Sequence, residues 1–347
     1  VAVTAATAGL SYAMQKKAGK VDTSGSEQGT LNIGRQQLIA QAVPPRRFVY
    51  GNTRVGGAMF FNDTKNPKLY IGSILSDGPV GGFSGVRVGT RDVPLTLATN
   101  GAGTITGTVP AGQVYTSKFK CEFRKGTETQ EASPVLLAEA SFLLTAAFQQ
   151  RRAACMVYQL DWGTDSQENS TLWGASAAPT VLLQGMCVYD PRDVTQTIAD
   201  VNSWKYSANV ALICAHFLTN TWGDALSAAN DIDWASVAVA ATVCDTPITY
   251  GAATYPLFSF AGIVQSGADR AQQLAKMLST MRGSVTELNG QLTMYADAAR
   301  TPIFTIEEID IIEIKDFIGE PPDSDIYDEI SAEYTDSNDS SGSTTTP

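Results

Sequence analysis

The sequence predicts a mainly β protein with an α+β part. Short stretches rich in aromatic and β-branched residues recur about every ten residues through the first half, which is typical of strands. Apolar residues in the second half recur instead at helical spacing. With 347 residues, of which 44% are apolar and 17% charged, the chain is long enough for two or three domains that each bury a core.

The first half contains the predicted strands. Residues 48–50 and 53–61 flank Gly51-Asn52, a pair typical of a tight turn between two strands. A second hairpin is expected at Asn100-Gly101. Further strands are predicted for residues 69–76, 83–88, 93–99, 104–109 and 114–123. Strands this short and this frequent favour a β-barrel or a β-sandwich.

Residues 134–149 form the longest apolar run of the chain. The run has Glu139 inside it and is shorter than the roughly 20 residues that a membrane-spanning helix needs. It therefore predicts a buried core helix or a pair of strands.

The second half predicts helices and one hairpin. Residues 209–218 are apolar enough for a short core helix, and the aspartates before residues 234–243 are placed to cap a second one. Residues 268–281 repeat at helical spacing, and Gly283 is typical of a helix stop. Asn289-Gly290 then lies between two strand-like runs, which is the strongest hairpin signal in the chain. With residues 301–305 these elements predict a compact α+β unit.

The acidic residues are concentrated near the C-terminal end of the sequence. The formal net charge is −11, but residues 307–339 hold 13 acidic residues and one basic residue, Lys315. Subtracting these from the totals of 35 acidic and 24 basic residues leaves 22 and 23 in the rest, which is electrically balanced. Such a balance argues against nucleic acid as a partner of the whole chain, because phosphate binding needs a basic face.

Composition and pattern together predict four regions. They are an N-terminal arm (1–40), a β-rich domain with inserted hairpins and loops (41–200), an α+β domain (201–305), and an acidic C-terminal segment that leads to a further domain or is disordered (306–347).

Few residues suggest chemistry. His216 is the only histidine and lies in an apolar segment, so we interpret it as a core or interface residue, and histidine-based metal sites are excluded. The five cysteines lie about thirty residues apart without CxxC spacing, which favours reduced, buried thiols. The glycine-rich residues 78–85 lack the Gly-Lys-Ser/Thr of a phosphate-binding loop. No cofactor and no enzymatic activity are expected.

Carboxylates and tryptophans leave two alternatives open. Asp161 and Asp165, in an aromatic setting, would suit a glycan or cell-wall hydrolase. A carbohydrate-binding adhesin would instead use Trp162, Trp173 and Trp222 as stacking platforms. The pairs Asp190/Asp193 and Asp231/Asp233 are better explained by turns and helix caps than by a metal ion.

A series of segments resembles one family. Residues 44–57 are PPRRFVYGNTRVGG, residues 69–79 are LYIGSILSDGP, and residues 179–192 are PTVLLQGMCVYDPR. Later stretches fit in the same order, up to a helix, hairpin and Glu-Glu-Ile segment at residues 274–309. Together they resemble the tail-tip attachment protein J family, the baseplate hub (central tail hub) proteins of long-tailed bacteriophages. The resemblance extends over about residues 40–335, and the run QGMCVYDPR is its most specific part.

The resemblance implies a fold, an assembly and a location. The fold is a tail-tube-like β-barrel hub domain, or more than one, plus an α+β hub domain, assembling as a ring. The assembly is a homotrimer that closes the distal tail tube in the virion, after assembly in the bacterial host cytoplasm. The implied partners are other tail-tip and tail-tube proteins, a host surface receptor reached directly or through fibres, passing DNA without sequence-specific binding, and a membrane at ejection.

The residues that the resemblance singles out have structural or interface roles. The strands at residues 50–61 and 181–189 are expected to build the barrel, Asp190-Pro191-Arg192 to end it, and the helix at residues 268–281 to brace the following hairpin. The complete set is Arg47, Tyr50, Gly51, Arg54, Gly57, Gly185, Tyr189, Asp190, Pro191 and Arg192.

Overall fold

The computed structural model describes most of the chain between residues 38 and 298. The described residues are 38–41, 43–89, 91–163, 172–173, 179–298, 307 and 312–313, with the backbone of 332–334 and 344–346. The predictions for the arm at residues 1–40 lie almost wholly outside them, as do Asp165, residues 301–305 and most of the acidic segment. Within the described part the fold is mainly β, as predicted.

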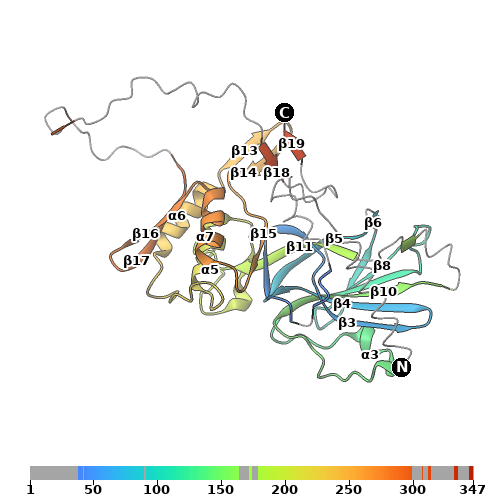
Figure 1. The fold of residues 1–347 in the computed structure, drawn as a ribbon. Coiled ribbons are helices and arrows are strands. Elements are labelled where there is room, and N and C mark those ends of the chain that lie inside the picture. Colours follow the sequence, from blue (N-terminus) through green and yellow to red (C-terminus); the bar gives the residue numbers. More distant parts are fainter. Residues whose placement is uncertain are drawn as a thin grey trace.

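The β-rich part consists of two antiparallel sheets that share one core (Figure 1). The first sheet contains, in spatial order, β3 (Ala58–Lys65), β4 (Lys68–Asp77), β10 (Ala153–Asp161), β9 (Phe119–Lys125), β8 (Ile105–Thr108) and β7 (Thr96–Thr99). The second contains β12 (Lys205–Tyr206), β11 (Pro179–Val188), β5 (Val80–Val88) and β6 (Arg91–Val93), and β2 (Asn52–Val55) also pairs with β11. Their facing side chains include Leu75, Val86, Phe123, Tyr158 and Leu183.

The predicted closed barrel is wrong, because both sheets stay open among the described strands. The chain passes from β4 to β5 through Gly78-Pro79, and Gly78 takes a φ of +90° at this corner. The two sheets are therefore joined by the chain and by side-chain packing rather than by a continuous ladder. Of the two architectures that the strand spacing left open, the described strands form the sandwich.

Strand β1 (Arg47–Tyr50) corrects a second prediction. It pairs with β15 (Gly262–Gln265), more than 200 positions away, and not with the strand that follows it. Only Gly51, with a φ of +61°, separates β1 from β2, and β2 pairs at once with β11. One residue is too short a connection for the predicted hairpin.

The α+β part has a separate core built by three helices. These are α5 (Val210–Thr219), α6 (Trp234–Cys244) and α7 (Arg270–Thr280). The predicted N-terminal cap of α6 is confirmed for Asp233, whose side chain accepts hydrogen bonds from the first turn. Asn209 and Asp269 cap α5 and α7 in the same way. In Figure 1 the helices lie to one side of the sandwich.

Three two-stranded units complete the described structure. The hairpin of β16 (Ser284–Leu288) and β17 (Gln291–Tyr295) turns at Asn289-Gly290, as predicted. The hairpin packs mainly along α6 through β17, whereas α7 packs mainly on α5. The expectation that α7 braces the hairpin is therefore wrong, because α6 makes the main contact with it. A second hairpin joins β13 (Pro247–Tyr250) to β14 (Ala253–Pro256), and β18 (Ala332–Tyr334) pairs with β19 (Thr344–Thr346).

Residues 126–152 form neither the core helix nor the strand pair expected for most of them. They contain only α3 (Pro134–Leu137) and a 3₁₀ turn, η1 (Ala140–Phe142); a second 3₁₀ turn, η2 (Val201–Ser203), lies elsewhere. A buried network holds the segment against β9. Glu122 accepts hydrogen bonds from Ser133 Oγ and Val135 N, and Arg124 donates to the carbonyl oxygens of residues 131 and 149.

Candidate functional site

The two cores meet at β1, which lies between them. Phe48 and Tyr50 pack into the helical core, whereas Val49 packs into the sandwich core, and each is at most 2% exposed. Alternate side chains of one strand point to opposite sides, so a four-residue strand can serve both cores. We call β1, Gly51, Gly185 and residues 260–261 the junction.

Two glycines allow the backbones of the junction to come this close. Gly185 N donates a 2.8 Å hydrogen bond to Gly51 O. A Cβ on Gly185 would lie 2.4 Å from Val49 O, and a Cβ on Gly51 would lie 2.0 Å from Phe260 O. Neither distance is sterically allowed, and Gly51 also needs its left-handed backbone. Both residues belong to the predicted set, and the structure brings them into direct contact.

A hydrogen bond crosses the helical core beside the junction. Tyr50 Oη lies 2.7 Å from His216 Nδ1, and both side chains are buried. Burial lowers the pKa of His216 to about 3 and raises that of Tyr50 well above its usual range, so both groups are neutral at ordinary pH. The interpretation of His216 as a core histidine is confirmed.

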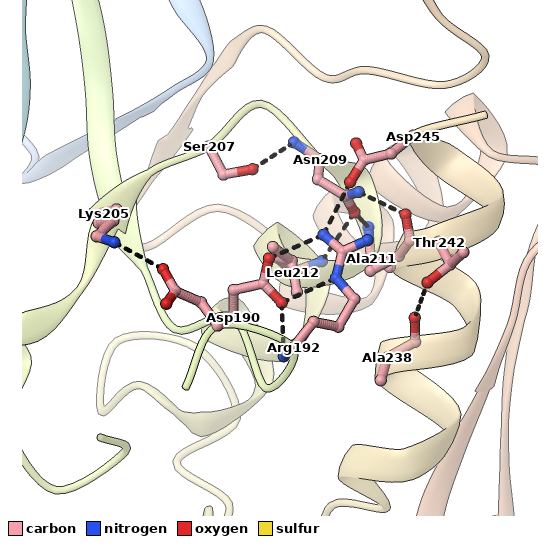
Figure 2. Close-up of polar contacts among 12 residues, drawn as sticks. Asp190, Arg192, Lys205, Ser207, Asn209, Ala211, Leu212, Ala238, Thr242 and Asp245 are labelled. Atoms are coloured by element: carbon pink, nitrogen blue, oxygen red, sulfur yellow. Dashed lines mark hydrogen bonds and ion pairs between the residues drawn. The ribbon is translucent and has the colours of Figure 1, made fainter. Parts of the chain in front are cut away.

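The Asp190-Pro191-Arg192 turn after β11 ties the sandwich to α6 (Figure 2). Arg192 Nη2 donates 2.8 Å hydrogen bonds to Asp190 Oδ2 and Asp245 Oδ2, and Arg192 Nε donates to Asp190 Oδ1 at 2.9 Å. Partial burial of Asp190 opposes its ionisation, but the hydrogen bonds from Arg192 outweigh it and keep the pKa below its ordinary value. Because Asp245 caps the C-terminus of α6, Arg192 also complements the negative end of that helix.

A second ion pair and a shared cap reinforce this turn. Lys205 Nζ donates to Asp193 Oδ2 at 2.8 Å, and this contact is the main cause that lowers the pKa of Asp193. Asn209 caps α5 through its side-chain oxygen and donates from Nδ2 to Ala241 O of α6 at 2.8 Å. The end of β11, the start of α5 and the end of α6 are thus connected by polar contacts within one small region (Figure 2).

Of the other predicted residues, Tyr189, Arg47 and Gly57 lie near the junction and Arg54 does not. Tyr189 follows β11 and packs edge-on against Trp234, with ring centroids 5.1 Å apart. Arg47 begins β1. Gly57 has a φ of +80°, and a Cβ at this position would lie 2.7 Å from Ile74 O. Arg54 lies away from the junction, on β2 opposite Leu182, where burial and then nearby Arg87 lower its pKa.

Of the residues behind the two alternatives, Asp161, Trp162, Trp173 and Trp222 are described, and each takes part in the fold. Asp161 Oδ1 accepts a 2.8 Å hydrogen bond from Gly163 N and so forms a local turn. Trp173 is 2% exposed in the sandwich core, and Trp222 stacks on Phe48 with ring centroids 3.7 Å apart. Trp162 packs partly buried against the same core as Trp173.

In the described part of the chain, no group of three or more His, Cys, Asp or Glu side chains could hold a metal ion. No described helix is long and apolar enough to cross a membrane. All five cysteines are free thiols, and burial raises the pKa of Cys155 to about 11.

Sequence reasoning missed the partners on the helical side. Asp245 lies within residues 40–335, over which the resemblance extends, but nothing in the resemblance links it to Arg192, which lies 53 positions earlier. Trp204 and Trp234 were not singled out, although both line the region beside Tyr189. Nothing local in the sequence marks these pairs; only the C-terminal position of Asp245 on a predicted helix could have suggested a basic partner.

Comparison with known proteins adds little. No family model and no curated protein matches the chain. Among solved structures, a chain from the "Virion of native gene transfer agent (GTA) particle" is 10% identical with a TM-score of 0.40. The match covers 80% of this chain and 57% of that chain, so this chain spans less than two thirds of it. So distant a likeness carries no argument about function.

Proposed function

We propose that the chain is a structural protein of a long-tailed phage virion, the trimeric tail-tip or baseplate hub that closes the distal tail tube. In this role it takes part in host attachment and lets DNA pass. One observation carries the proposal: the segments that resemble the hub family pack on one another. Residues 44–57 and 179–192 meet through Gly51 and Gly185, and residues 69–79 form β4 and the corner beside β1.

The proposal is of a non-enzymatic protein. The sole histidine is buried against Tyr50, and Asp161 holds a turn, so the described residues that catalysis would draw on are occupied in folding. The polar contacts at and beside the junction join one element to another: Tyr50 to His216, Arg192 to Asp245, and Asn209 to Ala241. Such contacts favour a rigid building block.

The β13–β14 hairpin supports contact between copies. No charged residue lies between Asp245 and Asp269, and the hairpin exposes Ile248, Tyr250 and Tyr255 by 43%, 84% and 53%. Natural edge strands are usually protected by charges, because unpaired backbone groups invite another chain. We propose that this hairpin packs against a neighbouring copy in the trimer.

The mass of the purified protein and its place in the particle test the proposal. We expect three copies by light scattering and gold-labelled antibody at the tail tip. Tyr250→Arg should give a folded monomer, because it places a charge in the proposed contact, whereas Val114→Arg, also at an exposed apolar position, should leave the trimer intact. A stable wild-type monomer that is absent from virions would overturn the proposal.

A further inference from the structure

A pocket beside the junction is lined by aromatic rings. It has a volume of about 110 Å³ and lies between the turn after β11, the C-terminal end of α5 and the start of α6. Tyr189, Trp204 and Trp234 form its walls, and His216 contributes to its lining. No charged side chain lines it.

Most polar groups of the lining already have partners. Trp204 Nε1 donates to Thr197 O at 3.0 Å, and Trp234 Nε1 donates to Ala228 O at 2.7 Å. Thr219 Oγ1 and Asn220 Nδ2 donate to carbonyl oxygens of α5 itself. None of the described residues hydrogen-bonds to His216 Nε2, Asn220 Oδ1 or Tyr189 Oη, and of these three side chains only His216 is buried.

The tautomer of His216 follows from its contact with Tyr50. Among the described residues Nδ1 is the sole acceptor within reach of the protonated Tyr50 hydroxyl, so the hydroxyl donates and Nδ1 accepts. A neutral imidazole that accepts at Nδ1 carries its proton on Nε2. Burial keeps the ring neutral, with a pKa of about 3, so the buried side chain offers one N–H donor that the protein leaves unused.

We propose that this pocket binds the acetamido group of an N-acetylated amino sugar, with the methyl group among the rings of Tyr189, Trp204 and Trp234 and the carbonyl oxygen on His216 Nε2–H. The volume decides the size of the group, because a cavity of roughly 150 Å³ holds benzene and this one holds somewhat less. The uncharged lining excludes ions, whose desolvation nothing would offset.

The only histidine of the chain makes the test direct. With ¹⁵N-labelled histidine the full-length protein gives one pair of ring-nitrogen signals, and we expect the proton on Nε2. N-acetylglucosamine should shift the Nε2–H resonance saturably with a Kd on the order of 1 mM, as befits a four-atom contact. Glucose and glucosamine, which lack the acetyl group, should not shift it.

Variants and a second acetamide separate the remaining outcomes. Tyr189→Ala should weaken binding at least about tenfold, whereas Val114→Ala, at an exposed apolar position that does not line the pocket, should leave it unchanged. N-acetylalanine methylamide presents the same acetyl group on a peptide and should bind more weakly than the sugar. Equal or tighter binding of the peptide would overturn the assignment to a glycan, and a proton on Nδ1, or no shift with any acetamide, would overturn the site. The result does not depend on whether the protein is a trimer.

Discussion

At the scale of the residue, Gly185 sets how closely β1 approaches β11. An alanine there would place its Cβ 2.4 Å from Val49 O and 2.8 Å from Tyr50 Cα, both backbone atoms that cannot rotate away. We expect Gly185→Ala to lower the free energy of unfolding by about 3 kcal/mol, at the upper end of overpacking effects, as measured by urea denaturation. Gly85→Ala on the neighbouring β5 is the control, because nothing lies within 4 Å of its Cβ and it should change stability by less than about 1 kcal/mol. Equal effects of the two changes would contradict this account of the junction.

His216 predicts how stability depends on pH. Its pKa is about 3 in the folded protein and 6.5 in the unfolded chain, so between these values only the unfolded chain binds the proton. Stability from this residue is therefore complete above about pH 6.5 and is lost as the pH falls towards 3. We expect a loss of about 2 kcal/mol between pH 7 and pH 5, measured by chemical denaturation.

The matched control for this pH dependence replaces both partners of the hydrogen bond. The double variant Tyr50→Phe, His216→Phe leaves no buried polar group unpaired and should fold. Its stability should stay nearly constant between pH 7 and pH 5. The same slope in wild type and double variant would show that other groups titrate in this range.

At the scale of the element, the sequence could predict those helices and turns whose formation depends on residues close together in the chain. Helices α5, α6 and α7 were expected close to their observed bounds, because spacing and caps are local properties. Residues 126–152 were not, because Glu122 and Arg124 lie on β9 and hold the segment from outside it. Residues 114–118 were expected to be strand but turn instead, since Thr116 Oγ1 donates to Pro110 O and accepts from Gln113 N.

Asn209 connects two helices, and its removal tests how much this connection stabilises the protein. Its side-chain oxygen caps α5 and its Nδ2 donates to Ala241 O of α6, and the residue is 4% exposed. We expect Asn209→Ala to cost about 2 kcal/mol, the sum of a lost cap and a lost buried hydrogen bond. Asp269→Ala removes only the cap of α7 and should cost about 1 kcal/mol by the same thermal or urea measurement. Equal losses would mean that the link to α6 contributes nothing.

At the scale of the whole molecule, the resemblance located the junction but not its partners. The chain segments around Gly51, Gly185 and Arg192 could be recognised by their order, whereas the pairing of β1 with β15 depends on residues more than 200 positions apart. The balance of charge outside residues 307–339 is compatible with surfaces that pack together, but it does not say where such a surface lies. Only the structure places the uncharged stretch after Asp245 on an exposed hairpin.

The sharing of β1 predicts that the two cores unfold together. Val49 fills the sandwich core while Phe48 and Tyr50 fill the helical core, so loss of either core removes the support of the same strand. In hydrogen exchange at increasing urea, the slowest amides of β10 and α6 should converge on one free energy of opening. Val49→Ala touches only the sandwich side, yet it should lower the value for both elements by about 2 kcal/mol. Val239→Ala, at a position of α6 that is 67% exposed, should lower neither by more than about 0.5 kcal/mol. A loss confined to β10 would mean that the cores are independent domains and that β1 is only a tether between them.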